Sequence, residues 1–582
     1  MDGNYTIEAP TNANLVFSFV GYQEQTVSID GREEINVSMQ QAVTELEEVV
    51  AVGYGTKRRS ELSSSVTVVE GDELEDMSTG NLSTKLQGQV AGLQISNSSG
   101  HPAQGASMLV HGEGSIGAGT GPLFVVDGVI GGNVNPNNIE NITVLKDAAA
   151  TGLYGSRAAN GVVIITTKSG QAGETQVHLS SKIGPAFHRN NGFELMNAEQ
   201  LYNNRRQAGI NYYEKNEDEI GVSFEEWFNT QVPPSALDRT ANWPELLTRT
   251  GYVNQHNLSV SGGNEQTTFY ASADYFYEKG TMVAENFQRI DLRSNLEHQI
   301  SDRFKLNFRI NLGTEQHPND PFGGQSSHAV QYYINMPWDP AYEEDGSPYD
   351  PYQSGYWFGN ANANYFYQKE HYEDRTKSMH ITPDVVLEAE ITDWLTFSTH
   401  NRYNVSGTDN YRRFDKYSYE ARSDEGRVRK DYSYSNDFTT SNRLDIDHSF
   451  SDHNLSAILG QEYSYHQWTN TQSVGARIPM GVTALDATAS PKSVAGDVAE
   501  NVFLSYFGQL NYNYFNRYYL TASLRGDASS RFGANNRWAT FGSIAGSWRI
   551  ANEDFFDISW IKGLKLKGSY GVTGNANIPN YL

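Results

Sequence analysis

The chain has 582 residues and a formal charge of -26, which argues against nucleic-acid binding because phosphates would repel it. It contains no cysteine, so disulfides and thiolate metal sites are excluded. No run approaches the roughly 18 apolar residues of a membrane helix. However, 12% of the residues are aromatic, and transmembrane β-strands hide their apolar face in alternate positions.

The first 42 residues contain three short strand-like runs, at 5–9, 14–22 and 35–39. They amount to about half of a small β-sandwich, too little to bury a core alone. The opening residues have neither a basic nor an apolar signal region. We therefore expect the chain to lack a secretion signal.

Residues 43–58 are acidic, then apolar, then basic, as in a linker with a strand-forming centre. A short strand of this kind can add to the sheet edge of a partner protein, although an ordinary linker strand is the alternative. The candidate partner-binding residues are Glu47, Glu48, Val49, Val50, Ala51 and Val52.

A glycine-rich α/β region follows between residues 59 and 172. The apolar runs PLFVVDGV and NGVVIITTKSG predict strands that are buried on both faces. Asp147 is placed to cap a short helix that Gly152 or Gly155 can end. This region is predicted to be a domain of its own.

The sequence GEGSIG at 112–117 matches a dinucleotide-binding pattern, but a strand rather than a helix follows it. We interpret these glycines as turns at the tip of the domain, where Gly114 and Ser115 are candidate ligand contacts. Asp127 in VVDGV is interpreted as part of a turn that ends a strand.

From residue 173 onward the sequence alternates between apolar and polar residues. Leu292 and Leu296, for example, share one face, while Arg293 and Asn295 share the other. We count about thirteen strands, joined alternately by tight turns and longer connections. In a meander, every second connection lies at the same edge, so the pattern predicts an antiparallel transmembrane barrel with short turns at one rim and long loops at the other.

The long connections are rich in tyrosine, tryptophan, glycine and aspartate. Trp338, Tyr356 and Trp357 are candidate sugar-stacking residues, with an aromatic girdle at the membrane interface as the alternative. Glu388 and Glu390 share a strand face, as a glycosidase would require, but lumen polarity explains them more simply. We expect no enzyme activity, no cofactor and no metal site.

Residues 85–129 and 135–170 closely resemble the plug of SusC/RagA-like TonB-dependent outer-membrane transporters of Bacteroidota. Residues 2–29 resemble the end of the carboxypeptidase-regulatory-like domain of that family, and 46–56 resemble its TonB-box region. The domains implied by the resemblance are this β-sandwich remnant (1–42), the TonB-box linker (43–58), the plug (59–172) and the first part of the transmembrane β-barrel (173–582).

The family resemblance implies a mainly β fold, in which a barrel of about 22 strands encloses the plug. It also implies plug-gated, TonB-dependent import of a glycan or another oligomeric nutrient across the outer membrane. The implied partners are the inner-membrane TonB complex, a SusD-like surface lipoprotein, outer-membrane lipid and a glycan or peptide ligand. The alternatives are a secreted carbohydrate-active or carbohydrate-binding β-rich protein and a surface-adhesion or structural β protein.

Thirteen strands are about half of such a barrel, so we expect the chain to be a fragment that lacks the C-terminal half of the barrel. Within the plug, Arg157 and Lys146 are the candidate contacts to the barrel. Arg157 can form a forked ion pair with a barrel carboxylate, such as Glu297, Glu388 or Glu390. Local pairing within the plug is the alternative, and it suits Lys146 better because that residue starts a helix.

Overall fold

In the computed structural model the chain forms two units, Met1–Leu62 and Ser63–Leu582. The structure describes all residues except 1–5, 8, 11–12, 18–24, 33, 39–48, 59–60, 76, 78, 98–99, 103, 111, 113, 116–117, 133, 190–191, 193, 284, 320–327, 353–356, 358–363, 557, 559, 562 and 581–582.

The first unit contains two small antiparallel hairpins. Strand β1 (Asn14–Phe17) pairs with β2 (Gln25–Ser28), and β3 (Val49–Val52) pairs with β4 (Gly55–Arg58). The predicted run at 14–22 contains a strand that begins at residue 14. The described residues of the runs at 5–9 and 35–39 are not in a strand, so those two predictions are wrong.

The plug is built on a five-stranded mixed sheet with strand order β5-β10-β11-β8-β9. Only the β11–β8 pair is parallel. The strand bounds are β5 (Val66–Glu70), β6 (Leu93–Ser96), β7 (Ser107–Val110), β8 (Leu123–Val126), β9 (Val129–Ile130), β10 (Ile139–Leu145) and β11 (Val162–Thr167). β6 and β7 form a separate hairpin. The continuous apolar runs correctly predict β8 and β11 as buried strands.

Short helices complete the plug: α1 (Gly71–Glu75), α2 (Leu82–Lys85), α3 (Ala148–Thr151), and the 3-10 helices η2 (Pro136–Asn138) and η3 (Gly152–Arg157). Asp147 caps α3 as predicted, accepting a hydrogen bond from the Ala150 N–H at 2.7 Å. The aliphatic core includes Leu74, Leu86, Ile142 and Val163, all fully or nearly fully buried. A rigid domain therefore precedes the large sheet.

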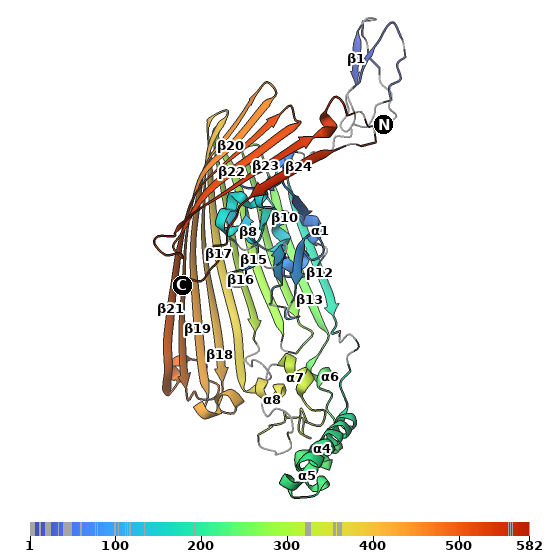
Figure 1. Cartoon of the computed structure of the whole chain (residues 1–582), viewed down its shortest axis with the longest axis vertical. Coiled ribbons are helices and arrows are strands. Elements are labelled where there is room, and N and C mark those ends of the chain that lie inside the picture. The colour runs from blue at the N-terminus through green and yellow to red at the C-terminus, as the bar shows by residue number, and fades with distance from the viewer. Residues whose placement is uncertain are drawn as a thin grey trace. The chain divides into compact units, whose positions relative to one another are not determined.

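The rest of the chain forms one thirteen-stranded antiparallel sheet in which every strand pairs with its neighbours in sequence (Figure 1). The strands are β12 (Gly173–Ala186), β13 (Gly251–Gly263), β14 (Thr267–Lys279), β15 (Asn286–Ser301), β16 (Phe304–Pro318), β17 (Tyr372–Thr392), β18 (Leu395–Phe414), β19 (Arg427–Phe450), β20 (His453–Ala476), β21 (Ser490–Tyr514), β22 (Tyr518–Ser529), β23 (Trp538–Arg549) and β24 (Lys565–Gly571). The predicted thirteen-strand meander is confirmed.

Tight turns and long connections alternate from β12 to β23, as predicted, whereas the connection between β23 and β24, residues 550–564, breaks the alternation. The sequence pattern predicts longer connections at 406–431 and 465–500, and the structure corrects the lengths of both. Most of those residues extend β18, β19, β20 and β21, which reach 20 to 25 residues. Serine, threonine, asparagine and tyrosine alternate there without an apolar face, so the hydrophobic pattern gives no signal although the backbone ladder continues.

The two faces of the sheet have opposite chemistry. On β15, Leu292 is 46% exposed, whereas the neighbouring Asp291 is 3% exposed and lies on the face that contacts the plug. Leu296 is likewise exposed and Asn295 buried. Apolar side chains thus point away from the protein and polar ones toward the plug, which is the reverse of a soluble protein and the arrangement of a lipid-facing barrel wall.

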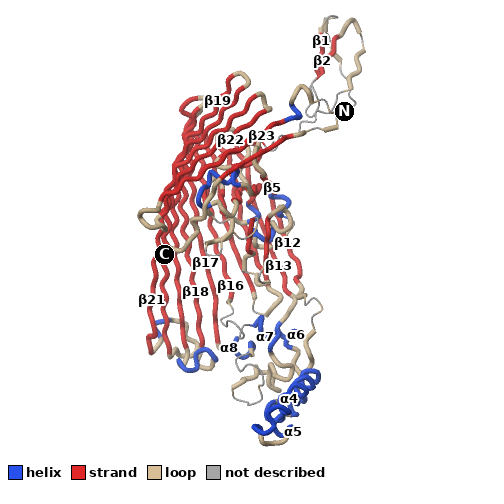
Figure 2. Tube along the Cα trace, viewed as in Figure 1, coloured by secondary structure: helices blue, strands red, loops and turns tan. Residues whose placement is uncertain are grey.

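The helices of the long connections gather at one edge of the sheet, as Figure 2 shows. They are α4 (Ala198–Ile220), α5 (Phe224–Gln231), α6 (Trp243–Leu247), α7 (His328–Ile334), α8 (Tyr365–Glu370), and the 3-10 helices η4 (Pro234–Asp238), η6 (Tyr419–Asp424) and η7 (Leu485–Ala487). A further 3-10 helix, η8 (Ile550–Asn552), follows β23. No described helix is both long enough and apolar enough to span a membrane.

Candidate functional site

The interface between plug and sheet contains a closed network of charges around η3. Arg157 donates a hydrogen bond to Glu462 on β20. The same carboxylate lies 3.4 Å from Nη2 of Arg525 on β22, and Arg525 Nε lies 2.6 Å from Asp527 Oδ1. Asp527 in turn accepts hydrogen bonds from both the N–H and the hydroxyl of Ser156, each at 2.8 Å. Two cations and two anions thus alternate, with the charges balanced.

Burial makes this network strongly dependent on its geometry. The Arg525 side chain is 0% exposed, and its Nη1 donates to the Leu153 carbonyl at 2.7 Å. Gly155 adopts φ 55° and ψ -122°, and a Cβ atom there would come within 2.3 Å of Asp527 Oδ2. A glycine is therefore required both by the backbone conformation and by the close approach of β22.

The structure corrects the suggested partners of Arg157. Its carboxylate is Glu462, not Glu297, Glu388 or Glu390. Glu297 instead pairs with Lys305 near the short-turn end of the sheet. All these carboxylates occupy polar positions of the alternating strand pattern. Which of them contacts η3 depends on the strand register and on the position of the plug against the sheet.

Lys146 contacts the plug itself rather than the barrel wall. Its Nζ donates to Thr67 Oγ1 at 2.9 Å and to the Ala91 carbonyl at 2.8 Å. The assignment of Lys146 as a plug–barrel contact is therefore wrong, and the local alternative describes it.

Asp127 provides a second plug–barrel contact, which the sequence analysis treats only as a turn residue. It has φ 49°, and Arg293 on β15 lies 2.9 Å from its Oδ2. The Thr167 N–H also donates to Asp127 Oδ1 at 2.9 Å. Burial alone would raise the pKa of Asp127, but Arg309, Arg293 and this N–H hold it below its ordinary value.

Arg402 on β18 binds the plug through backbone carbonyls. Its guanidinium donates to the carbonyls of Val126 (2.9 Å) and Gly131 (2.8 Å), while Asp384 neutralises it at 2.5 Å. Backbone acceptors do not carry a side-chain signature. Sequence inspection therefore has no means of finding this contact.

The asparagines of η2 form a further patch of contacts, in which the plug side chains are uncharged. Asn137 donates to Asp274 on β14 at 2.8 Å and accepts from Gln255 on β13 at 3.0 Å. Asn138 accepts from the hydroxyls of Tyr270 (3.0 Å) and Ser272 (2.7 Å). Such hydrogen bonds are individually modest and exchange readily with water, which suits an interface that must be remade.

The tip of the plug contacts the segment after β24. The Gly119 N–H donates to the Asn577 carbonyl at 3.0 Å, and the Ala576 N–H donates to the Ser156 carbonyl at 2.6 Å. Of the predicted ligand contacts at this tip, Gly114 lies beside Asn160 and the Ser115 hydroxyl accepts from the Ala118 N–H. Whether these two residues touch a ligand stays a prediction.

Neither of the two candidate sugar-stacking residues that the structure describes, Trp338 and Trp357, forms the open platform expected of a sugar binder. Trp338 is 1% exposed and packs in an apolar cluster with Phe228. Trp357 is half-buried and meets Trp243 edge to face at 5.8 Å. Tyr356 lies outside the described residues. Trp338 is therefore corrected to a packing residue, because its ring is covered by protein.

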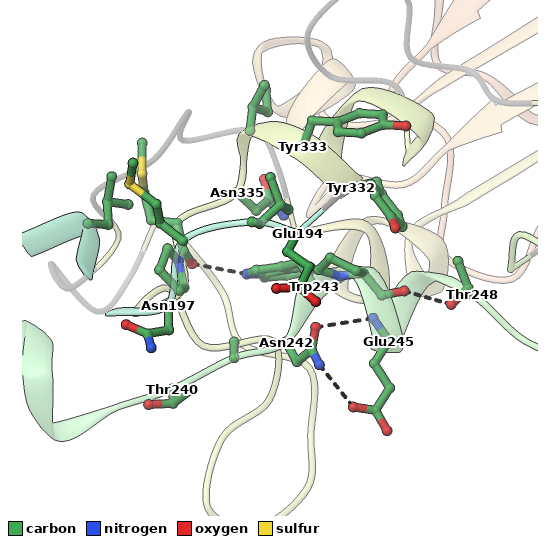
Figure 3. A pocket seen from close by; sticks show the side chains of 18 of the residues that line it. Glu194, Asn197, Thr240, Asn242, Trp243, Glu245, Thr248, Tyr332, Tyr333 and Asn335 are labelled. Atoms are coloured by element: carbon green, nitrogen blue, oxygen red, sulfur yellow. Dashed lines mark hydrogen bonds between the residues drawn. The ribbon is translucent and has the colours of Figure 1, made fainter. Parts of the chain in front are cut away.

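A cavity of about 1050 Å³ opens among the long loops (Figure 3). It is bounded by His188 and residues 194–197 before α4, by 240–245 and Thr248 around α6, and by 332–337 at the end of α7. Asn197 caps α4 by accepting from the Gln200 N–H at 2.9 Å, which fixes one wall. The alternation of apolar and polar residues does not predict these helices, because they lie in the connections between strands.

Residues 58–162 match the family model of the TonB-dependent receptor plug domain. The whole chain is 30% identical to the TonB-dependent receptor P3 of Formosa agariphila and covers 56% of that protein. It is 27% identical, over 99% of its length, to the TonB-dependent receptor SusC of Bacteroides thetaiotaomicron, and covers 58% of it. The RagAB peptide importer in its closed-closed state superposes with a TM-score of 0.78 and 28% identity, over 89% of this chain and 61% of that one.

This chain contains a TonB-dependent receptor plug domain and is similar, over nearly its whole length, to SusC/RagA-like TonB-dependent receptors. The expected outer-membrane β-barrel location is thereby confirmed. SusC and RagAB are described as a receptor and an importer, which agrees with the expectation that this SusC/RagA-like chain is not an enzyme. The chain spans little more than half the length of the curated relatives that it matches.

Proposed function

We propose that the protein containing this chain imports an oligomeric nutrient, a glycan or a peptide, across the outer membrane. The observation that carries the proposal is the buried plug: a folded domain sits against the polar face of a sheet whose other face is apolar and exposed. A plug held by hydrogen bonds and balanced ion pairs can be displaced without exposing an apolar core. Import by plug displacement needs that property.

Energy input is proposed to enter through Glu47–Val52 as the TonB box. Glu47 and Glu48 lie outside the described residues, and β3 uses one of its edges to pair with β4. The partner would add a strand to the remaining edge or replace β4. A SusD-like lipoprotein is the proposed lid over the long loops, and the similarity to the RagAB peptide importer supports an oligomeric cargo.

The alternative, a secreted carbohydrate-active or carbohydrate-binding protein, is not favoured by the structure. Such a protein would bury its apolar strand face. Here the apolar residues of β15 are exposed and the polar ones are buried.

Uptake in cells tests the proposal. The full-length gene is deleted and restored either as wild type or with Val50→Pro, and growth is measured on panels of glycans and peptides. Val50→Ile serves as the matched control, and surface display of each variant is measured by antibody. The proposal predicts a nutrient on which wild type and Val50→Ile grow but Val50→Pro does not, because proline breaks strand addition. Equal growth of Val50→Pro at equal display would contradict it.

A further inference from the structure

The loop cavity has the size of a ligand site, yet none of the plug–sheet contacts uses it. Its volume of about 1050 Å³ lies at the upper end of ligand pockets, which hold roughly 300–1,000 Å³. Three separate stretches of two long loops converge on it. A cavity of this size accommodates several linked units of an oligomer rather than a single ring.

The accessible walls of the cavity are mostly aliphatic or thioether. Met196 is 49% exposed, and Leu195 is also exposed beside it. Methionine adapts its shape to varied apolar partners, and covering such side chains is favourable for any apolar group that enters. The apolar lining residues are Leu195, Met196, Leu201, Ala241, Trp243, Pro244, Tyr332, Tyr333, Ile334, Met336 and Pro337.

Two of the three aromatic rings in the lining are committed to the framework. Trp243 is 1% exposed, and its Nε1–H donates to the carbonyls of Met336 and Asp339, both at 3.2 Å. Tyr332 is buried and packs against His188 with ring centroids 5.5 Å apart. Only Tyr333 is exposed. Sugar hydroxyls placed against aliphatic walls would lose water without gaining partners, so the walls favour apolar side chains over a glycan.

The charges of the lining favour a cation. Glu194 and Glu245 are exposed carboxylates, and Glu245 also accepts from Asn242 Nδ2 at 3.0 Å. Arg205 is the single lysine or arginine of the lining, and its Nη2 already contacts Met336 Sδ at 3.5 Å. Two carboxylates against one guanidinium leave the cavity with one net negative charge when His188 is neutral. A ligand with a positive group therefore complements it.

We propose that this cavity binds a short peptide that combines bulky apolar side chains with a positive group, either a free ammonium or a basic side chain. The inference rests on the proposed function only in that the long loops must face the outside. Binding at the cavity and import through the protein are measured separately, so either can fail without the other.

Equilibrium binding to the full chain in detergent tests the proposal. The probe is a short fluorescent peptide of leucine, phenylalanine and lysine with a free N-terminus, and a maltooligosaccharide is the competitor. Glu194→Gln combined with Glu245→Gln removes the charge without changing shape. Thr240→Trp fills the cavity from an exposed position. Glu214→Gln with Glu219→Gln, on the exposed face of α4 outside the cavity, is the matched control.

The expected result is saturable peptide binding that the maltooligosaccharide does not displace. The Glu194/Glu245 variant should weaken binding about fivefold at low ionic strength, and the difference should shrink at about 0.5 M salt. Thr240→Trp should abolish binding, while the α4 control should bind as wild type does. No binding by wild type, unchanged binding by Thr240→Trp, or displacement by the oligosaccharide would each overturn the proposal.

Discussion

Arg157 of the plug and Glu462 of β20 are 305 residues apart in sequence, and they form the ion pair that ties the end of η3 to the sheet. The Glu462 side chain is 2% exposed, and Arg525 shares it. Since breaking a buried pair leaves a charge without compensation, the pair should control how firmly the plug is seated.

The first prediction concerns this pair. Arg157→Gln should lower the free energy of plug unseating by about 2 kcal/mol, somewhat less than the usual cost of breaking a buried pair because Arg525 remains. Glu462→Gln should do the same, and the double variant should cost less than the sum of the two. Urea-dependent proteolysis of the plug measures all three. Arg206→Gln, in the exposed pair with Glu225, is the control and should change little. Strict additivity would show that the pair does not act as a unit.

The second prediction concerns Asp127 and acid. Because its folded pKa lies below the ordinary value of 3.8, its ionised form stabilises the seated plug at any pH above that value. This contribution is lost as the pH falls further, through the folded pKa. Asp127→Asn should therefore lower the free energy of plug unseating by about 3 kcal/mol at neutral pH. It should also make this free energy depend less on pH in the acid range. Plug proteolysis between neutral pH and strong acid measures both effects, and parallel curves for variant and wild type would contradict the assignment.

Lys85 gives a third prediction, in the alkaline range. Burial, aided by Lys182, lowers the pKa of Lys85 to about 8 from 10.5, although its Nζ donates to the Leu74 carbonyl at 2.8 Å. The unfolded chain then binds more protons than the folded one between these values, so stability of the plug should rise with pH across that window by about 3 kcal/mol. Lys85→Met should remove this rise. Chemical unfolding at several alkaline pH values provides the measurement, and an identical slope in the variant would refute the lysine's role.

A fourth prediction separates close approach from backbone strain. Gly155 and Gly88 both have positive φ, but a Cβ at Gly88 meets nothing within 4 Å, whereas one at Gly155 collides with Asp527 and Arg525. Gly88→Ala should cost about 1 kcal/mol, the ordinary penalty of that conformation. Gly155→Ala should lower the free energy of unfolding by clearly more than Gly88→Ala does, and it should loosen the plug. Thermal unfolding and plug proteolysis compare the two, and equal losses would mean that the approach of β22 is not limiting.

Much of the fold follows from local patterns. The two-residue alternation in β15 and β16 repeats without interruption, and turns such as Ser301–Asp302 separate the strands, so strand number and order are readable. Asp147 is equally readable because an N-cap needs only residues three positions away. The alternating pattern fails to predict strands where neither face is apolar, as at the ends of β19 to β21 next to the long connections.

The site is less predictable, because it depends on how two separately folded parts meet. The sequence shows that Arg157 needs a carboxylate, but many carboxylates point to the same side of the sheet. Glu462 is selected by its height along β20 and by the position of η3. The contact made by Arg402 is still harder to predict from the sequence, because its acceptors are backbone carbonyls of the plug. The loop cavity arises from the packing of helices that no apolar stripe in the sequence predicts.

Site-directed spin labelling tests the central claim, that the apolar strand face meets lipid and the polar face meets the plug. The chain has no cysteine, so single cysteines at Leu292, Leu296 and Asn295 can be labelled uniquely in the membrane-embedded protein. Labels at Leu292 and Leu296 should be relaxed by lipid-soluble oxygen and shielded from a water-soluble nickel chelate, and the label at Asn295 should be shielded from oxygen by the plug. Relaxation of the Leu292 label by the chelate, or of the Asn295 label by oxygen, would contradict the account.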